Sequence, residues 1–247
     1  MELKNKTILI TGASSGIGQA IAIACAKQGA TVLINYRSSK QGAEETLKQV
    51  EQFSKGFIFQ ADLIDQTQVS KMFEEIFNKV GAIDCLVNNA GEAKGGDFFT
   101  DEIWHYEIEN ILFSAVHCIQ RFIKQGENIA LRKIVNISSV YGNLIGASSD
   151  LGYAPYSAAK SAIQNMTVAL AKNFENVLIN AVAPGRVLTP AWGELSKAEK
   201  KDLTADTIIK RFIEPEEIAQ TVVYLLENDA VTGQIITVDG GLLLKNI

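Results

Sequence analysis

A tyrosine and a lysine lie four residues apart in the stretch Tyr-Ala-Pro-Tyr-Ser-Ala-Ala-Lys, at positions 153–160. Pro155 is suited to the first turn of a helix, where its missing N–H leaves no hydrogen bond unmade. Residues four apart share one face of a helix, so we expect Tyr156 and Lys160 to point the same way. An ammonium beside a phenol favours the phenolate, which lowers the tyrosine pKa and suits proton transfer. The plainer interpretation is a packed tyrosine beside a solvated lysine, and the pair alone does not exclude it.

A second pattern is the glycine-rich segment Thr-Gly-Ala-Ser-Ser-Gly-Ile-Gly at positions 11–18. It follows a short apolar run and opens a stretch with helical character. Gly12 permits a tight turn, while Gly16 and Gly18 let the backbone approach both a ligand and the sheet. The free N–H groups and the partial positive charge of a helix N-terminus attract a pyrophosphate. We therefore expect a dinucleotide site here, with a purely structural turn as the alternative.

The residues after the next apolar run indicate which dinucleotide is bound. Proteins that hold an adenosine ribose with free hydroxyls usually have a carboxylate at this point. This chain has none there and has Arg37, two serines and Lys40 instead. An arginine can bind a 2′-phosphate, so NADP(H) is favoured and NAD(H) stays possible. The alternative is that Arg37 and Lys40 belong to a solvated first turn of a helix.

The elements that position these residues alternate along the chain between short apolar runs and amphipathic stretches. The apolar runs lie at 6–11, 31–36, 56–63, 83–91, 133–139, 177–185 and 233–241. Strands that alternate with helices form parallel βαβ units, and strands that are apolar throughout belong in a sheet covered on both faces. We predict an α/β fold, a Rossmann-type doubly wound parallel sheet of seven strands with helices on both faces, in a single domain spanning 1–247.

Two stretches between these runs stand out. A long helix is expected from about residue 100 to residue 124, because apolar residues recur there at helical spacing. The polar, lysine-rich stretch 188–213 is interpreted as an insertion with short helices. We predict that this insertion is a substrate lid.

Composition excludes several classes of protein. The chain has 247 residues, a hydrophobic content of 47% and a net charge of −5, which argues against a nucleic-acid partner. It has no apolar run long enough to cross a membrane and no signal peptide, so we expect no membrane partner and a cytoplasmic location. Three unpaired cysteines and two histidines without ligand spacing predict no metal site.

Further motifs follow the predicted fourth, fifth and sixth strands, namely Asn-Asn-Ala-Gly at 88–91, Ile-Ser-Ser at 137–139 and Pro-Gly at 184–185. Ligands of an open parallel sheet bind at the carboxyl ends of its strands, where all of these motifs fall. Together with Tyr156 and Lys160, the set resembles the short-chain dehydrogenase/reductase family over about 6–241. Within that family the chain is most similar to 3-oxoacyl-acyl-carrier-protein reductases.

The resemblance implies catalytic roles. Tyr156 would be the general acid in carbonyl reduction and the base in alcohol oxidation. Lys160 would lower the pKa of Tyr156 and hydrogen-bond the nicotinamide ribose. Ser139 would hydrogen-bond the substrate oxygen, and Asn110 would hold a water in the proton relay.

The resemblance also implies which residues bind the cofactor. Asp62 and Leu63 would lie at the adenine, and Arg37 at the adenosine phosphate. The residues along the ribose and the central part of the cofactor would be Asn89, Ala90 and Gly91. The loop residues implied are Gly12, Ser14, Ser15, Gly16, Ile17 and Gly18. The nicotinamide would be lined by Pro184, Gly185, Val187 and Thr189, with the backbone of Val187 reaching the carboxamide, and would also contact Tyr156 and Lys160.

Several hypotheses about the substrate stay open. A 3-oxoacyl thioester competes with a sugar, a steroid or a small ketone. The segment between Ser139 and Tyr156 is longer than in the acyl-carrier-protein reductases, and it would border the substrate pocket. A hypothesis of a different class is a catalytically idle dinucleotide-binding redox sensor. The apolar C-terminus, Gly-Gly-Leu-Leu-Leu-Lys-Asn-Ile, and the resemblance predict a homotetramer or homodimer.

Overall fold

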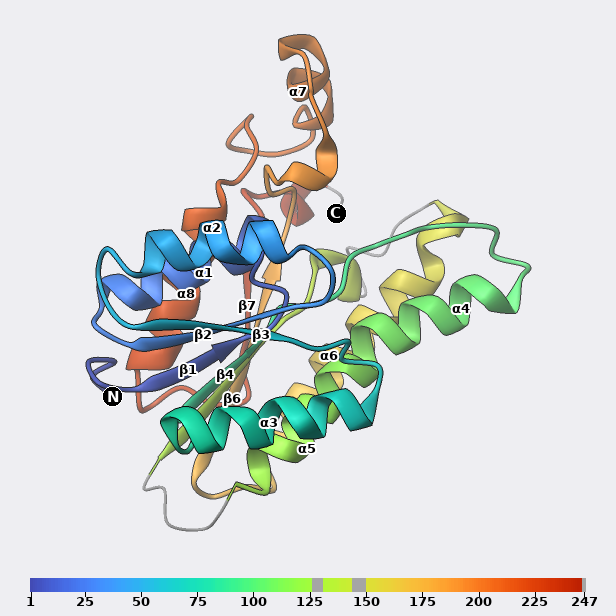
Figure 1. The fold of residues 1–247 in the computed structure, drawn as a ribbon. Helices are drawn as coiled ribbons and strands as arrows, with labels where there is room; N and C mark the ends of the chain where they lie inside the picture. Colours follow the sequence, from blue (N-terminus) through green and yellow to red (C-terminus); the bar gives the residue numbers. More distant parts are fainter. Residues whose placement is uncertain (126–130, 144–149, 246–247) are drawn as a thin grey trace.

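The computed structural model describes residues 1–125, 131–143 and 150–245 (Figure 1). Within these ranges the chain forms a seven-stranded sheet in the order β3-β2-β1-β4-β5-β6-β7. Every neighbouring pair in it is parallel. The strands are β1 Thr7–Ile10, β2 Thr31–Tyr36, β3 Gly56–Gln60, β4 Cys85–Asn88, β5 Arg132–Ile137, β6 Val177–Pro184 and β7 Ile235–Val238. The predicted fold class is confirmed.

The order of the strands places a crevice at the middle of the sheet. Leu9 in β1 pairs with Leu33 in β2 on one side and with Leu86 in β4 on the other. The chain runs outward from β1 to β3 and then returns to β4, so the strand order reverses between β1 and β4. In an open α/β sheet this reversal leaves room for a ligand at the carboxyl ends of the two strands.

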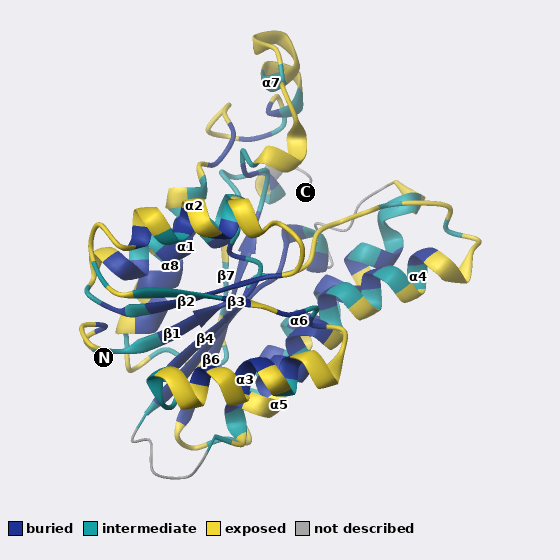
Figure 2. Ribbon diagram, viewed as in Figure 1, coloured by how far each residue is buried: buried dark blue, intermediate teal, exposed yellow. Residues whose placement is uncertain are grey.

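Helices cover both faces of the sheet (Figure 1). One face carries α1 Gly16–Lys27, α2 Lys40–Val50 and α8 Pro215–Glu227, and the other carries α3 Gln66–Val80, α5 Ser114–Ile123 and α6 Ala154–Ala171. Successive side chains of a strand alternate between the faces. Ile8 and Ile10 therefore join the core under the first set of helices, while Leu9 joins the core under the second. Figure 2 shows the buried strands between helices whose outer surfaces are exposed.

The predicted long helix over 100–124 is present, with a change of winding in its middle. α4 Asp101–Glu107 continues into a π-helical turn, η1 Ile108–Phe113, and then into α5. The N–H of Ser114 donates to the Glu109 carbonyl, five residues back. The Ser114 hydroxyl donates to the Asn110 carbonyl at 2.7 Å. Turns of this kind occur often at functional sites.

The stretch 188–213 stands away from the sheet and contains the 3₁₀ turn η4 Pro190–Trp192 and the helix α7 Lys197–Leu203 (Figure 1). A capping box begins α7, in which Ser196 and Glu199 satisfy each other's backbone N–H. That this stretch closes over a substrate stays a prediction.

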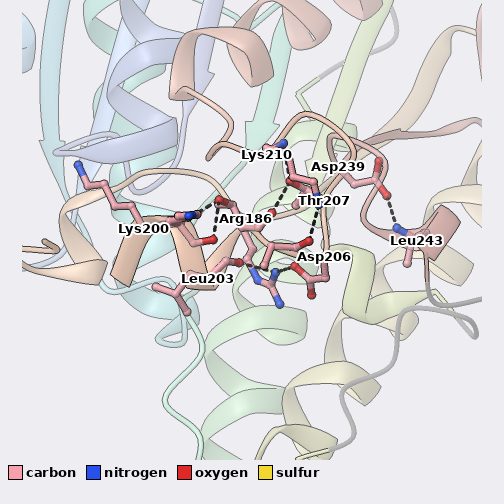
Figure 3. Close-up of polar contacts among 11 residues, drawn as sticks. Arg186, Lys200, Leu203, Asp206, Thr207, Lys210, Asp239 and Leu243 are labelled. Atoms are coloured by element: carbon pink, nitrogen blue, oxygen red, sulfur yellow. Dashed lines mark hydrogen bonds and ion pairs between the residues drawn. The ribbon is translucent and has the colours of Figure 1, made fainter. Parts of the chain in front are cut away.

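Arg186 fastens this stretch to the end of β6 (Figure 3). Its guanidinium donates to the Leu203 carbonyl at 2.6 Å and forms an ion pair with Asp206. The Thr207 hydroxyl next to it donates to the Thr204 carbonyl at 2.9 Å. The far end of α7 is thus held by a residue that directly follows the sheet.

No helix in the described ranges is long and apolar enough to span a bilayer. In the same ranges no group of histidine, cysteine and carboxylate side chains is arranged to hold a metal ion. Cys25, Cys85 and Cys118 are free thiols buried in the core. Burial raises the pKa of all three thiols, so they are packing residues rather than nucleophiles. The segment 144–149, which belongs to the longer connection between Ser139 and Tyr156, lies outside the described residues.

Candidate active site

The glycine-rich loop joins the end of β1 to the start of α1. Gly12 and Gly16 have φ angles of 60° and 57°, in the left-handed region that favours glycine. A Cβ atom at Gly18 would lie 2.5 Å from Asn89 Nδ2 and 2.6 Å from the Gly12 carbonyl oxygen. The loop therefore packs directly against the end of β4, and a larger residue at position 18 does not fit.

The N-terminus of α1 is suited to an anion. No side chain caps it, and its first turn contains no acidic residue. In contrast, the carboxylate of Asp65 caps α3 and the hydroxyl of Ser196 caps α7. The first N–H groups of a helix require acceptors, and a phosphate beside this loop would supply them. The residues present thus fit the pyrophosphate of a dinucleotide.

Thr11 and Asn89 join the loop to β4. The Thr11 hydroxyl oxygen is buried and accepts hydrogen bonds from the Asn89 N–H at 2.9 Å and the Ala90 N–H at 3.0 Å. In return the Asn89 amide donates to the carbonyls of Thr11 and Gly12 at 3.0 Å and 3.1 Å. The Asn-Asn-Ala-Gly motif is therefore held at a fixed distance from the loop.

Asn35 is a buried residue in this region that sequence reasoning missed. Its side-chain oxygen accepts from the Gly12 N–H at 3.2 Å, and its amide donates to the Ala61 carbonyl at 3.2 Å. Its own carbonyl accepts from the Ala13 N–H at 2.9 Å. One side chain in β2 thus connects the glycine loop to the end of β3.

These contacts surround a cleft of about 370 Å³ at the carboxyl ends of β1 to β4. The predicted cofactor residues that line it are Gly12, Ser14, Ser15, Gly16, Ile17, Arg37, Asp62, Leu63, Asn89, Ala90, Gly91 and Thr189. Residues that line it and were not predicted are Asn35, Ser38, Ser39, Ala61, Ile64, Glu92, Tyr106, Ser114, Pro190 and Ala191. Six predicted cofactor residues do not line the cleft, namely Gly18, Tyr156, Lys160, Pro184, Gly185 and Val187.

Arg37 reaches from the end of β2 toward the π-helical turn. Its Nη1 donates to Asn110 Oδ1 at 3.0 Å, and the Asn110 amide donates to the Tyr106 carbonyl at 2.9 Å. Asn110, predicted to be catalytic, therefore directs its side chain at Arg37 and lines the cleft. Its role in holding a relay water stays a prediction.

Tyr156, Lys160 and Ser139 come together at the end of β5 and the start of α6. The Ser139 side chain lies close enough to the Tyr156 hydroxyl to act on its pKa, and Lys160 Nζ lies 5.7 Å from the centre of the Tyr156 ring. Lys160 is 3% exposed, and its ammonium donates to the Ile137 carbonyl at 2.9 Å. The predicted juxtaposition of the phenol and the ammonium is therefore present.

The expected lowering of the Tyr156 pKa is wrong, because the shift of this pKa is upward. Burial raises the pKa of Tyr156 to about 12, while the hydrogen bond from Ser139 acts in the opposite direction. Burial also lowers the pKa of Lys160 to about 8. Desolvation disfavours the charged form of each group and is the largest cause of both shifts.

The sequence and the fold identify a family. Residues 12–243 match the family model described as enoyl-(acyl carrier protein) reductase. The chain is 33% identical to the 3-oxoacyl-[acyl-carrier-protein] reductase FabG of Staphylococcus epidermidis, over 97% of this chain and 100% of that protein. The chain belongs to the short-chain dehydrogenase/reductase family. As a member of this family, it is an NAD(P)-dependent oxidoreductase that acts on CH–OH or C=O groups.

Solved structures in this family have the same fold. The L-sorbose reductase of Gluconobacter frateurii, solved with NADPH and L-sorbose, superposes with a TM-score of 0.91 at 27% identity, over 98% of this chain and 99% of that one. The RhlG/NADP complex of Pseudomonas aeruginosa superposes with a TM-score of 0.88 at 26% identity, over 98% of each chain.

The residues that the family resemblance assigns to the nicotinamide lie at the end of β6 and just after it. A Cβ atom at Gly185 would lie 2.8 Å from the Cα of Asp239, so the backbone after β6 packs closely on the backbone after β7. Val187 is buried, and its carbonyl accepts from the Trp192 indole N–H at 2.8 Å. Roles for Pro184, Gly185 and Val187 in cofactor binding stay predictions.

Tyr141 is a further aromatic residue at the short-chain dehydrogenase/reductase site that sequence reasoning missed. It lies in the 3₁₀ turn η2 Val140–Gly142, which Ser139 caps by accepting the Tyr141 N–H. Its ring packs edge-on at 6.1 Å from Tyr156 and 6.4 Å from Tyr153. Tyr141 thus lies between the rings of Tyr153 and Tyr156 in one aromatic cluster.

Proposed function

We propose that the protein is an NADP(H)-dependent carbonyl reductase, with a 3-oxoacyl thioester as the first substrate to test. The observation that carries the proposal is the juxtaposition of Ser139 and Tyr156, with the buried Lys160 one helical turn away. This group follows β5, which pairs with β4, and residues that follow β4 line the cofactor cleft. Similarity to FabG over the whole chain supports the choice of thioester.

The residues of this site suit the donation of a proton. A bound nicotinamide cofactor supplies the hydride. As the hydride reaches the carbonyl carbon, the oxygen acquires alkoxide character and needs a donor beside it. Tyr156 is protonated at neutral pH, since the ordinary pKa of a tyrosine is near 10 and burial raises the pKa of this one. It can therefore act as that donor, while the Ser139 hydroxyl orients the same oxygen.

After the proton has left, Tyr156 is a phenolate beside Lys160. Because the pKa of Lys160 is about 8, its ammonium is largely charged at neutral pH and stabilises the phenolate. Ser138 stabilises this arrangement, because its hydroxyl donates to the Lys160 carbonyl at 3.0 Å. Gln164 on the next turn of α6 donates to the Ser139 carbonyl at 3.0 Å. Both serines of the motif are thus fixed to α6.

The proposed cofactor is NADP(H). Arg37 lies at the end of β2 beside the cleft, and two NADP(H)-bound relatives share the fold. Its guanidinium, which bonds the Asn110 amide oxygen, can rotate to a 2′-phosphate with better charge complementarity. Ser38 and Ser39 add hydroxyl donors to the same edge of the cleft.

The test measures NADPH and NADH oxidation against acetoacetyl thioesters, diketones, quinones and keto sugars. Tyr156→Phe keeps the ring and removes the hydroxyl. We expect it to lose turnover by at least about 100-fold while it still binds NADPH. If wild-type protein binds NADPH but turns over no member of the panel, the idle redox-sensor hypothesis replaces the reductase. Equal turnover by Tyr156→Phe would remove Tyr156 from the mechanism.

A further inference from the structure

Glu107, the last residue of α4, is a charged residue inside the protein. Its side chain is 0% exposed. A buried carboxylate is costly unless hydrogen bonds or an opposite charge compensate it. The helix turns α4 and η1 pack against α6, the helix of Tyr156 and Lys160. The surroundings of Glu107 therefore include the reactive group.

Only one of the two carboxylate oxygens of Glu107 is bonded. Oε1 accepts from the Lys94 N–H at 2.8 Å and the Gly95 N–H at 3.2 Å. Oε2 is buried and has no hydrogen-bond partner among the described residues. A buried acceptor of this kind in a native protein requires an explanation.

Lys160 has hydrogen-bond donors to spare, where Glu107 lacks a donor for one oxygen. Its ammonium has three N–H donors, and in the described part of the chain its one hydrogen bond goes to the Ile137 carbonyl. The charges of Glu107 and Lys160 attract each other within the same buried region. The unfilled oxygen of Glu107 and the unfilled donors of Lys160 thus match in charge and in burial.

No other acid competes for this lysine in the described region. The titratable groups that interact with Glu107 are Lys94, in the loop before α4, and Tyr156 and Lys160 on α6. Tyr141 interacts with Tyr156 in turn. The Lys94 ammonium is directed elsewhere, at Glu102, 3.8 Å away, and at a tyrosine ring. Glu107 is the one carboxylate that acts on Lys160 among the described residues.

We propose that Glu107 is the buried counter-ion of Lys160, a positioning residue that keeps the ammonium charged while Tyr156 transfers its proton. The proposal rests on the proposed function for its catalytic consequence and on the contacts above for the pairing itself. A water molecule between Oε2 and Nζ would satisfy both groups.

The pairing has a defined sign. Burial lowers the pKa of Lys160, and the charge of Glu107 opposes this effect. Without that charge the pKa of Lys160 falls further, so more of it is neutral at physiological pH. Burial raises the pKa of Glu107, and Lys160 is among the groups that lower it. Protonation of Glu107 should therefore perturb Lys160 on the acid side.

The test uses Glu107→Gln, which keeps an acceptor for the two backbone N–H groups and removes the charge. Glu109→Gln is the matched control, because Glu109 is exposed two residues along the same helical run. The first readout is the pH titration of Lys160 by NMR of protein labelled with ¹³C at lysine Cε, assigned with Lys160→Arg. We expect the Lys160 pKa to fall by about one unit or more in Glu107→Gln, a tenfold change in its ionisation constant, and to stay unchanged in Glu109→Gln.

The second readout is the pH profile of kcat/KM. The alkaline limb should move toward neutral pH in Glu107→Gln by the same amount. An unchanged Lys160 titration in Glu107→Gln overturns the proposal. If Glu107→Gln does not fold, wild-type protein decides: the Lys160 signal must respond to an acid-side titration, and a flat signal overturns the pairing. A shifted Lys160 titration in a protein without reductase activity would refute the proposed function and leave the pairing standing.

Discussion

The Thr11 hydroxyl offers a sharp test of how the cofactor cleft is built. Replacement of Thr11 by valine keeps the shape of the side chain and removes the oxygen that accepts from the Asn89 and Ala90 N–H groups at 2.9 Å and 3.0 Å. Each buried donor left without a partner costs about 1–3 kcal/mol. Since Asn89 and Ala90 are partly exposed, water can compensate in part, and we expect a total of about 2–3 kcal/mol.

The expected loss is measurable by thermal unfolding. For a domain of this size, 1 kcal/mol corresponds to roughly 2–4 °C in Tm, so Thr11→Val should melt about 4–12 °C below wild type. NADPH should also bind more weakly, because the Asn-Asn-Ala-Gly turn lines the cleft. Thr11→Ser keeps the oxygen and should lose less than half as much. If Thr11→Val melts within about 2 °C of wild type, the two hydrogen bonds do not hold the turn in place.

Three more predictions concern the same site. Gly18→Ala places a methyl group 2.5 Å from Asn89 Nδ2 and should weaken NADPH binding by at least about 10-fold in calorimetry, and unchanged affinity would contradict the close packing. Arg37→Ala should weaken NADPH binding by about 10- to 100-fold and leave NADH binding unchanged. Equal losses for both cofactors would instead indicate that the contact with Asn110 supports the cleft. Lys160→Met removes a group whose pKa is lowered from 10.5 to about 8 on folding, so the unfolded state binds more protons between these values and wild-type stability rises with pH there. The free energy of unfolding of wild type, measured in urea relative to Lys160→Met, should rise by about 1–3 kcal/mol across that pH window. A difference between the two proteins that does not change with pH would show that the lysine is not buried as described.

Much of the fold could be predicted because the same pattern of an apolar run followed by an amphipathic stretch recurs along the sequence. Each strand is a short apolar run between an amphipathic helix and a turn, and the parallel arrangement follows from that alternation. The glycine loop could also be predicted from the sequence, because its spacing after an apolar run is recognisable. The structure gives the reason for two of its glycines: a Cβ atom would lie 2.9 Å from the Ala90 Cα at Gly12 and 2.5 Å from Asn89 Nδ2 at Gly18.

The parts of the site that were missed have no local signal. Asn35 is one polar residue in an apolar strand, and only the folded chain places it between Gly12 and Ala61. Glu107 lies on a helix that has acidic residues on its exposed side, so it resembles a solvated residue until its burial is known. The pKa of Tyr156 was predicted in the wrong direction because spacing indicates the neighbour but not the degree of desolvation.

The π-helical turn between α4 and α5 changes which side chains face a given direction along an otherwise regular helix. Each residue of an α-helix advances the face by about 100°, so one extra residue in the turn rotates everything before it relative to everything after it. On one side of this offset Glu107 is buried in α4, which packs against α6, and within the turn Asn110 lines the cofactor cleft. A one-residue deletion within 108–113 is a small change in sequence length. It would nevertheless change which side chains face α6 and which face the cofactor cleft. Insertions and deletions here are thus a route by which relatives of this enzyme can diverge in chemistry without altering the sheet.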